Sequence, residues 1–346
     1  MSKWEEKRLE DIIDVNPPVK LKKGESYPFI DIDKVSPTRR SVTNEEVKVY
    51  DGQSSSKFCD GDTVFSRITP CLENRKIAKV AIEGDAAFGS TEFYVFRAKK
   101  KKADARFTYY LTSSDAVVLP AINSMTGASG RQRADKRFIQ RLKLNLPDLP
   151  TQERIADILS AYDDLIEANN HRIELLEQTA QELYREWFVR FRFPGYENAK
   201  FEDGIPEGWS YVRFGKAIDI IDGDRGVNYP KQEEFYPEGD CLFLNAGNVT
   251  SKGFNFSACS YITKEKDSIL RKGKLQHGDV VLTTRGTVGN VAFYNETMTF
   301  SEMRINSGMV ILRNLGVVSP EYIYTSLHHE YLQKLMTMYA SGSAQP

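Results

Sequence analysis

Cysteine and histidine side chains are the first candidates for chemistry in this chain, because both bind zinc. The four cysteines, Cys59, Cys71, Cys241 and Cys259, form no Cys-x-x-Cys pair, and the four histidines do not lie near them at ligand spacing. A zinc site needs four convergent ligands. We therefore predict no metal site and interpret the cysteines as buried or reduced thiols.

The segment Asn16-Pro17-Pro18-Val19 could bind an amine for methyl transfer, through its amide and a proline carbonyl. That chemistry also needs an aromatic ring after the prolines to stack on a flipped base, and Val19 cannot stack. The chain shows no glycine-rich turn for S-adenosylmethionine, no P-loop, no HExxH and no GxSxG motif. We interpret the segment as a proline-rich turn and predict that the chain has no active site of its own.

The composition of the chain is that of an ordinary globular protein. The chain has 346 residues, of which 40% are hydrophobic and 27% charged, so we expect two domains and a connector. No apolar run approaches the length of a membrane span, and the charged N-terminus does not resemble a signal peptide, so we expect a cytoplasmic protein.

Residues 1–150 carry 27 basic and 21 acidic side chains, whereas residues 151–190 carry 4 and 9. This distribution permits nucleic-acid binding by the first domain without requiring it.

Residues 151–190 have the pattern of one long helix. Apolar residues recur at alternating steps of four and three over nearly five heptads, without glycine or proline, from Thr151 as a plausible N-cap to Pro194-Gly195 as the stop. The seam consists of Ile155, Leu159, Tyr162, Ile166, Asn169, Ile173, Leu176, Ala180, Leu183 and Trp187. Acidic side chains around a narrow stripe favour a coiled coil, and the alternative is a helix buried in a globular core.

The segments on either side of this helix look like copies of each other. Trp4 matches Trp209, Gly61-Asp62 matches Gly278-Asp279, and the Gly/Ser turn at 126–131 matches 341–346, at offsets of 205, 217 and 215 residues. We infer an internal repeat of about 210 residues. The first copy is followed by the long helix, but no second helix follows Pro346. We therefore expect either truncation or a seam covered by another chain, with an antiparallel homodimer through 151–187 as one solution.

Residues 146–160, with 175–178 and Trp187-Phe188, resemble a conserved helical region of a known family, the specificity (S) subunit of type I restriction–modification systems. Residues 67–74 with 89–93 resemble one type of its target recognition domain, and residues 284–289 with 304–308 resemble another. Arg75 departs from the pattern, which has glycine there, and the family's second conserved helical region is absent.

The resemblance implies an α+β fold with two similar target recognition domains of mixed β-sheet and helices, joined by a long coiled-coil-forming helix. We expect the first domain at 1–146, the spacer and docking helix at 147–193 and the second domain at 194–346. Each domain would read one half of a bipartite double-stranded DNA site, and the helix would dock modification (methyltransferase) subunits, with a restriction subunit joining the complex. The chain would be no enzyme itself. S-adenosylmethionine, ATP and magnesium would bind only to partner subunits of this bacterial defence system, which methylates DNA adenine.

Base edges are read by Arg, Asn, Gln, Ser, Thr and Glu side chains, and phosphates by Lys, Arg and backbone amides. In the first domain we predict DNA contacts from Arg67, Thr69, Asn74, Arg75, Lys76, Ser90, Thr91, Glu92, Arg131 and Arg133. In the second we predict them from Arg225, Thr284, Arg285, Thr287, Arg304, Asn306, Ser307 and Gln345. The alternative hypothesis is a non-catalytic coiled-coil scaffold that binds proteins.

Overall fold

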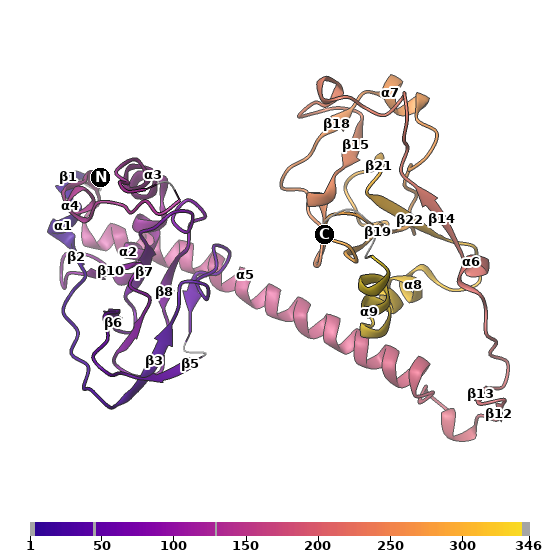
Figure 1. The fold of residues 1–346 in the computed structure, drawn as a ribbon, viewed down its shortest axis with the longest axis horizontal. Helices are drawn as coiled ribbons and strands as arrows, with labels where there is room; N and C mark the ends of the chain where they lie inside the picture. Colours follow the sequence, from indigo (N-terminus) through magenta and orange to yellow (C-terminus); the bar gives the residue numbers. More distant parts are fainter. Residues whose placement is uncertain (1–3, 44–45, 129, 341–346) are drawn as a thin grey trace. The chain divides into compact units, whose positions relative to one another are not determined.

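The structure is a computed structural model that describes residues 4–43, 46–128 and 130–340. It divides into two compact units, Met1–His171 (unit 1) and Arg172–Pro346 (unit 2). The boundary falls inside the long helix α5 (Leu149–Tyr184), so the first part of this helix belongs to unit 1 and the remainder to unit 2. Each unit is a mixed β-sheet structure with short helices, as predicted (Figure 1).

Unit 1 is built on a five-stranded sheet, β2-β10-β7-β8-β4, and a four-stranded sheet, β5-β3-β9-β6. Most neighbours are antiparallel, but each sheet contains one parallel pair, β4 with β8 and β3 with β9. The strands are β2 (Ile13–Val15), β3 (Ser26–Ile30), β4 (Ser41–Val42), β5 (Glu46–Val49), β6 (Ser56–Phe58), β7 (Thr63–Ser66), β8 (Ile77–Val80), β9 (Ala87–Gly89) and β10 (Phe93–Ala98).

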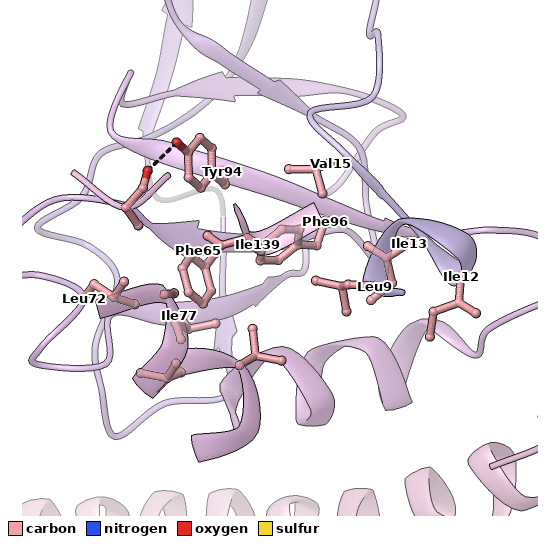
Figure 2. Close-up of a cluster of buried hydrophobic side chains, with 14 of the residues drawn as sticks. Leu9, Ile12, Ile13, Val15, Phe65, Leu72, Ile77, Tyr94, Phe96 and Ile139 are labelled. Atoms are coloured by element: carbon pink, nitrogen blue, oxygen red, sulfur yellow. Dashed lines mark hydrogen bonds between the residues drawn. The ribbon is translucent and has the colours of Figure 1, made fainter. Parts of the chain in front are cut away.

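A hydrophobic core lies between the five-stranded sheet and the four helices that precede and follow it in sequence. The helices are α1 (Leu9–Ile12), α2 (Ala105–Ser113), α3 (Asp115–Asn123) and α4 (Lys136–Arg141), and a two-stranded ribbon pairs β1 (Glu5–Arg8) with β11 (Lys143–Leu146). Phe65 of β7 and Phe96 of β10 pack edge to face with ring centroids 5.1 Å apart. Ile139 of α4 joins them in the same core (Figure 2). Strand β7 is buried at every residue, because both of its faces are covered.

Unit 2 repeats this plan. Its main sheet has the order β14-β22-β19-β20, which corresponds to β2-β10-β7-β8, and its second sheet has the order β18-β15-β21. Helices α8 (Pro320–Leu327) and α9 (Glu330–Tyr339) follow the sheet as α2 and α3 do in unit 1. The strands are β14 (Ile218–Asp222), β15 (Cys241–Leu244), β18 (Tyr261–Ile262), β19 (Val280–Thr283), β20 (Val291–Phe293), β21 (Met303–Ile305) and β22 (Met309–Asn314). The internal repeat is confirmed for the sheets and for these helices, while the turn at 341–346 that we matched to 126–131 lies outside the described residues.

The repeated Gly-Asp turns have the same structure in both units. Gly61 and Gly278 adopt φ angles of +79° and +91°, which glycine tolerates best. The following Asp62 is 3% exposed and accepts two hydrogen bonds from Arg97, at 2.7 and 2.6 Å. Asp279 accepts two from Arg313 in the same way, at 2.9 and 2.7 Å. A buried ion pair therefore joins neighbouring strands at the same place in each repeat.

The two units differ at the segment that precedes the main sheet. In unit 1, Leu9 is 0% exposed because it packs in the core with Ile139 and Leu146 of the α4–β11 segment. The corresponding residue of unit 2, Phe214 in α6 (Phe214–Ala217), is 47% exposed. Among the described residues of unit 2, no helix and strand follow α9 in the way that α4 and β11 follow α3.

The N-cap of helix α5 lies three residues earlier than predicted. Asp148, rather than Thr151, caps it, since the Asp148 carboxylate accepts the Thr151 amide at 3.1 Å. The α-helix ends at Tyr184 and continues as a π-helical turn, Arg185–Val189, so the predicted unbroken seam is wrong at Trp187.

No helix in the described part of the chain combines the length and the apolar character that crossing a membrane requires.

Candidate nucleic-acid interface

Three segments of unit 1 that are distant in sequence meet at one end of the main sheet. Arg67, directly after β7, donates its backbone N–H to the Glu92 carbonyl at 2.9 Å. The N–H of Ala134 donates to the Arg67 carbonyl at 2.8 Å, and Thr69 donates to Gln132 at 3.0 Å. The structure therefore brings together predicted residues from 67–76, 90–92 and 131–133. We call these segments the reading loops of unit 1.

Two of the predicted arginines share one carboxylate in these loops. Glu92 accepts hydrogen bonds from Arg133 Nε and Nη2, at 2.9 and 2.6 Å, and one from Arg67 Nε at 3.2 Å. The bonds from Arg133, together with the charge of Arg67, hold the pKa of Glu92 below its ordinary value despite partial burial. The Arg67 guanidinium also lies over the Tyr94 ring. The Tyr94 hydroxyl donates to the Ala134 carbonyl at 2.7 Å, the dashed bond in Figure 2. The group is therefore a fixed and ionised cluster.

Two other predicted cations are engaged with unit 1 itself. Arg75 forms an ion pair with Asp115 and donates to the Ser113 carbonyl at 3.1 Å. Its φ of +52° lies in the left-handed region, which accounts for the glycine that we expected at this position. Lys76 is half-buried and donates to the Ile32 carbonyl at 3.0 Å. Arg75 is nevertheless 45% exposed, so its contact with DNA stays a prediction, whereas the half-buried Lys76 is directed toward unit 1.

The remaining predicted residues of unit 1 are polar groups at the surface of the reading loops. Thr69 Oγ1 accepts the Gln132 amide at 3.1 Å, and Ser90 Oγ accepts the Glu92 amide at 3.3 Å. Asn74, Thr91 and Arg131 are exposed, and no side-chain hydrogen bond or ion pair joins them to other residues that the structure describes.

The basic run 99–102 and the Asn16-Pro17 segment lie elsewhere. Strand β10 runs from Phe93 beside the reading loops to Ala98, so Lys99 lies at the opposite end of the sheet. Its ammonium group donates to the Glu10 carbonyl at 2.6 Å. Asn16 accepts the Val95 amide at 2.8 Å, which supports its interpretation as a structural turn.

In unit 2 the same end of the sheet carries a shorter loop. The backbone N–H groups of Thr284 and Arg285 donate to the Gly308 carbonyl at 2.8 and 3.2 Å. These bonds correspond to the bond from the Arg67 N–H to the Glu92 carbonyl in unit 1. Asn306 Oδ1 accepts the Gly308 amide at 2.8 Å, which closes the turn before β22. The side chain of Arg285 is exposed and has no hydrogen bond or ion pair with any residue in the described part of unit 2.

Arg225 approaches the same loops from the end of β14. It contacts Asp222 at 3.8 Å and the Ser307 carbonyl at 3.4 Å, and both contacts are long. Thr287 contributes its carbonyl, which accepts the hydroxyl of Thr283. We call Arg225, 284–289 and 306–308 the reading loops of unit 2. Gln345 lies outside the described residues.

The predicted DNA contact from Arg304 is wrong for this fold. Arg304 is 6% exposed in β21 and pairs with Asp267 through Nε. Its other nitrogens donate to the carbonyls of Asp267, Leu270 and Lys272, at 2.9, 3.1 and 2.6 Å. Because Arg304 is buried and four of its five N–H donors bond inside the unit, it stabilises unit 2 and is not placed to read a base.

Two hydroxyls that the sequence analysis missed support the reading loops. Ser66 ends β7 and donates to the Lys76 carbonyl at 2.6 Å, which ties the two ends of the loop together. Thr283 ends β19 and donates to the Thr287 carbonyl in the same way. In both repeats the last residue of a buried strand carries a hydroxyl group. This shared feature could have identified the two residues from the sequence.

Helix α5 contacts each unit with residues outside the seam. Gln152 is buried and donates to the Pro147 carbonyl at 2.9 Å, and Asp163 accepts the Tyr110 hydroxyl at 2.6 Å. In unit 2, Gln181 donates to the Thr325 carbonyl at 3.1 Å. Apart from the partly covered Ile155, the seam residues are exposed, with Tyr162 and Leu176 at 65% and 62%, so the alternative of a helix buried in a globular core is wrong.

The described residues contain no group of histidine, cysteine and carboxylate side chains that could hold a metal ion. All four cysteines are free thiols, and burial raises the pKa of Cys241 to about 12.

The sequence matches a known protein family over its first half. The model of the family described as "Type I restriction modification DNA specificity domain" matches residues 1–178. The chain is 27% identical to the type I restriction enzyme MjaVIII specificity subunit of Methanocaldococcus jannaschii over 234 residues, which are 65% of this chain and 53% of that protein. The MjaIX specificity subunit of the same organism is 24% identical over 279 residues, 75% of this chain and 61% of that protein. The chain thus spans about half to three fifths of these relatives.

Among solved structures, the fold is similar to the crystal structure of a type I restriction–modification system S subunit from M. genitalium. The TM-score is 0.53 at 14% identity, with 98% of this chain and 79% of that chain covered. This likeness concerns the fold.

Proposed function

The chain belongs to the type I restriction–modification DNA specificity family, and we propose that each of its two units reads one half of a bipartite double-stranded DNA site. In this proposal the chain supplies recognition, while modification and restriction subunits bind S-adenosylmethionine, ATP and magnesium and carry out the chemistry. The proposal rests on one observation above all. In both units, loops rich in Arg, Asn, Ser and Thr converge at the same end of corresponding sheets.

The chemistry of these loops supports base reading. Hydroxyl, amide and guanidinium groups match the donor and acceptor pattern of the major groove. The loops also differ between the units, since unit 1 has Arg67 and Glu92 where unit 2 has Thr284 and Gly308. Different side chains on equivalent backbones support two different half-sites, and thus a site that is not palindromic.

Arg285→Ala tests reading by unit 2. We expect the affinity for the specific duplex to fall roughly tenfold or more, because a bidentate arginine–guanine contact contributes about 1–3 kcal/mol. Fluorescence anisotropy at several salt concentrations measures both the affinity and its salt dependence. The matched control is Arg213→Ala, an exposed arginine at the opposite end of β14, which should leave the affinity unchanged.

The salt dependence decides between DNA reading and the scaffold hypothesis. Phosphate neutralisation releases counterions, so the logarithm of the binding constant falls linearly with the logarithm of salt concentration. If the wild-type chain shows no steep decline, or binds no duplex, the scaffold hypothesis is favoured.

We also propose that the exposed seam of α5 docks the modification subunits. Leu176→Glu should change the free energy of unfolding of the isolated chain by less than about 0.5 kcal/mol, since Leu176 is exposed. The same substitution should abolish co-elution with the modification subunit in size-exclusion chromatography with light scattering. Gln178→Glu, which adds the same charge outside the seam, is the control. A homodimer of the isolated chain that Leu176→Glu disrupts would assign the seam to a second copy instead.

A further inference from the structure

The arrangement of Arg67, Glu92 and Arg133, which we call the Glu92 clamp, differs from a set of independent base contacts. A guanidinium has a side edge formed by Nε and Nη2 and an end edge formed by Nη1 and Nη2. Arg133 gives its side edge to both oxygens of Glu92, and Arg67 gives its Nε to one of them. Among the described residues, Nη1 of Arg133 and both Nη atoms of Arg67 have no hydrogen-bond acceptor.

We infer that Glu92 is a positioning residue, which holds Arg133 by its side edge and Arg67 by its Nε so that their end edges read guanine in the half-site of unit 1. This inference rests on the proposed function. The end edge of arginine matches guanine O6 and N7 in a bidentate contact. Because Glu92 restrains both long side chains before binding, less rotational freedom is lost when the contact forms.

The surroundings of the clamp support this role. The side chain of Glu92 is 20% exposed, whereas those of Arg67 and Arg133 are 30% and 44% exposed, so the cations present more surface to a ligand than the carboxylate does. Glu92 itself is unsuited to a phosphate-lined surface, because its charge repels the DNA backbone. Its acceptor atoms are already occupied by the two arginines.

Unit 2 provides a comparison within the same molecule. Gly308 and Thr284 occupy the positions of Glu92 and Arg67, and Arg285 has no carboxylate partner among the described residues. A change in the clamp should therefore affect only one of the two half-sites.

The test selects duplexes from a randomised library with the full-length chain and compares wild type with Glu92→Gln. We expect guanine preference to fall roughly tenfold at positions of one half-site, while the other half-site is unchanged. Affinity for random duplex should rise at the same time, with a salt slope steeper by up to about 0.9, because one negative charge is removed. Loss of specificity with a gain in non-specific affinity is not expected from a purely structural role.

Arg133→Lys is the second variant, because it retains the charge but cannot form the bidentate pair. It should lower guanine preference in the same half-site without changing the salt slope, and thermal melting should show that both variants fold. A wild-type chain that enriches no sequence overturns the proposed function and the inference together. A bipartite wild-type motif that Glu92→Gln leaves intact, or loses in both halves, overturns the inference alone. A variant motif altered only at a cytosine would instead show that Glu92 reads the base directly, which also overturns the positioning role.

Discussion

We expect Asp62→Ala to lower the free energy of unfolding of unit 1 by about 3 kcal/mol. Asp62 is almost fully buried and accepts hydrogen bonds from Nε and Nη2 of Arg97 and from the Cys59 amide, the last at 2.7 Å. Its loss leaves a half-buried guanidinium without a partner, and removing one member of a buried pair costs about 3–5 kcal/mol. We take the lower part of this range because water reaches Arg97.

Urea unfolding followed by hydrogen exchange measures this effect separately in each unit. Amides of β7 should lose protection while those of β19 keep it, and Asp279→Ala should produce the reverse pattern. Asp51→Ala, an exposed carboxylate in unit 1, serves as the control and should change stability by less than about 0.5 kcal/mol. A loss below about 1 kcal/mol for Asp62→Ala would contradict the structural role of the pair.

Arg304→Ala should destabilise unit 2 by about 4 kcal/mol. The substitution leaves the Asp267 carboxylate without its closest partner and three carbonyls without donors, and each such loss is costly in a buried site. Asp267 keeps one ion pair, with Lys274 at 2.7 Å, which limits the effect. Thermal unfolding by calorimetry measures the change.

The control for Arg304→Ala is Arg285→Ala in the same unit. Arg285→Ala should leave the unfolding temperature unchanged and weaken DNA binding. Arg304→Ala should lower the unfolding temperature of unit 2, and any loss of DNA binding should follow from that destabilisation. If Arg304→Ala folds normally and loses only DNA affinity, the assignment of Arg304 to the interior is wrong.

The sequence predicted the repeat correctly because its markers have local causes. A glycine with positive φ followed by a buried aspartate is required at one tight turn, and the same requirement recurs at Gly61-Asp62 and Gly278-Asp279. Local patterns therefore sufficed to align the copies and to predict that the polar turns lie at strand ends.

Residues with long-range partners could not be assigned in this way. Arg304 and Lys76 were predicted to contact DNA, but their partners Asp267 and Ile32 are 37 and 44 residues away in sequence. Nothing in the local pattern of Arg304 distinguishes it from Arg285, which is exposed. The pairing of Arg133 with Glu92, 41 residues away, was hidden for the same reason.

The long helix illustrates an intermediate case. The seam periodicity correctly predicted a helix and an apolar stripe, since both depend on neighbouring turns. It could not predict that Gln152 and Asp163, outside the seam, contact unit 1, because their partners Asp104 and Tyr110 are 48 and 53 residues away in sequence.

The hydroxyls of Ser66 and Thr283 have a consequence for how such a protein diversifies. Each hydroxyl bonds a backbone carbonyl of its own loop. Backbone bonds lie beside them, from Ser66 N–H to the Lys76 carbonyl at 3.1 Å and from Thr283 N–H to the Asn290 carbonyl at 3.0 Å, so the exposed side chains of the loop are not needed to close it. The loop at 67–76 and the shorter one at 284–290 show that even length varies on this base. Mutations can therefore accumulate at the exposed positions of the loops at little risk to folding, whereas Leu72, which is buried in the core, stays constrained. A lineage can acquire a new target sequence in this way while inheriting an unchanged scaffold.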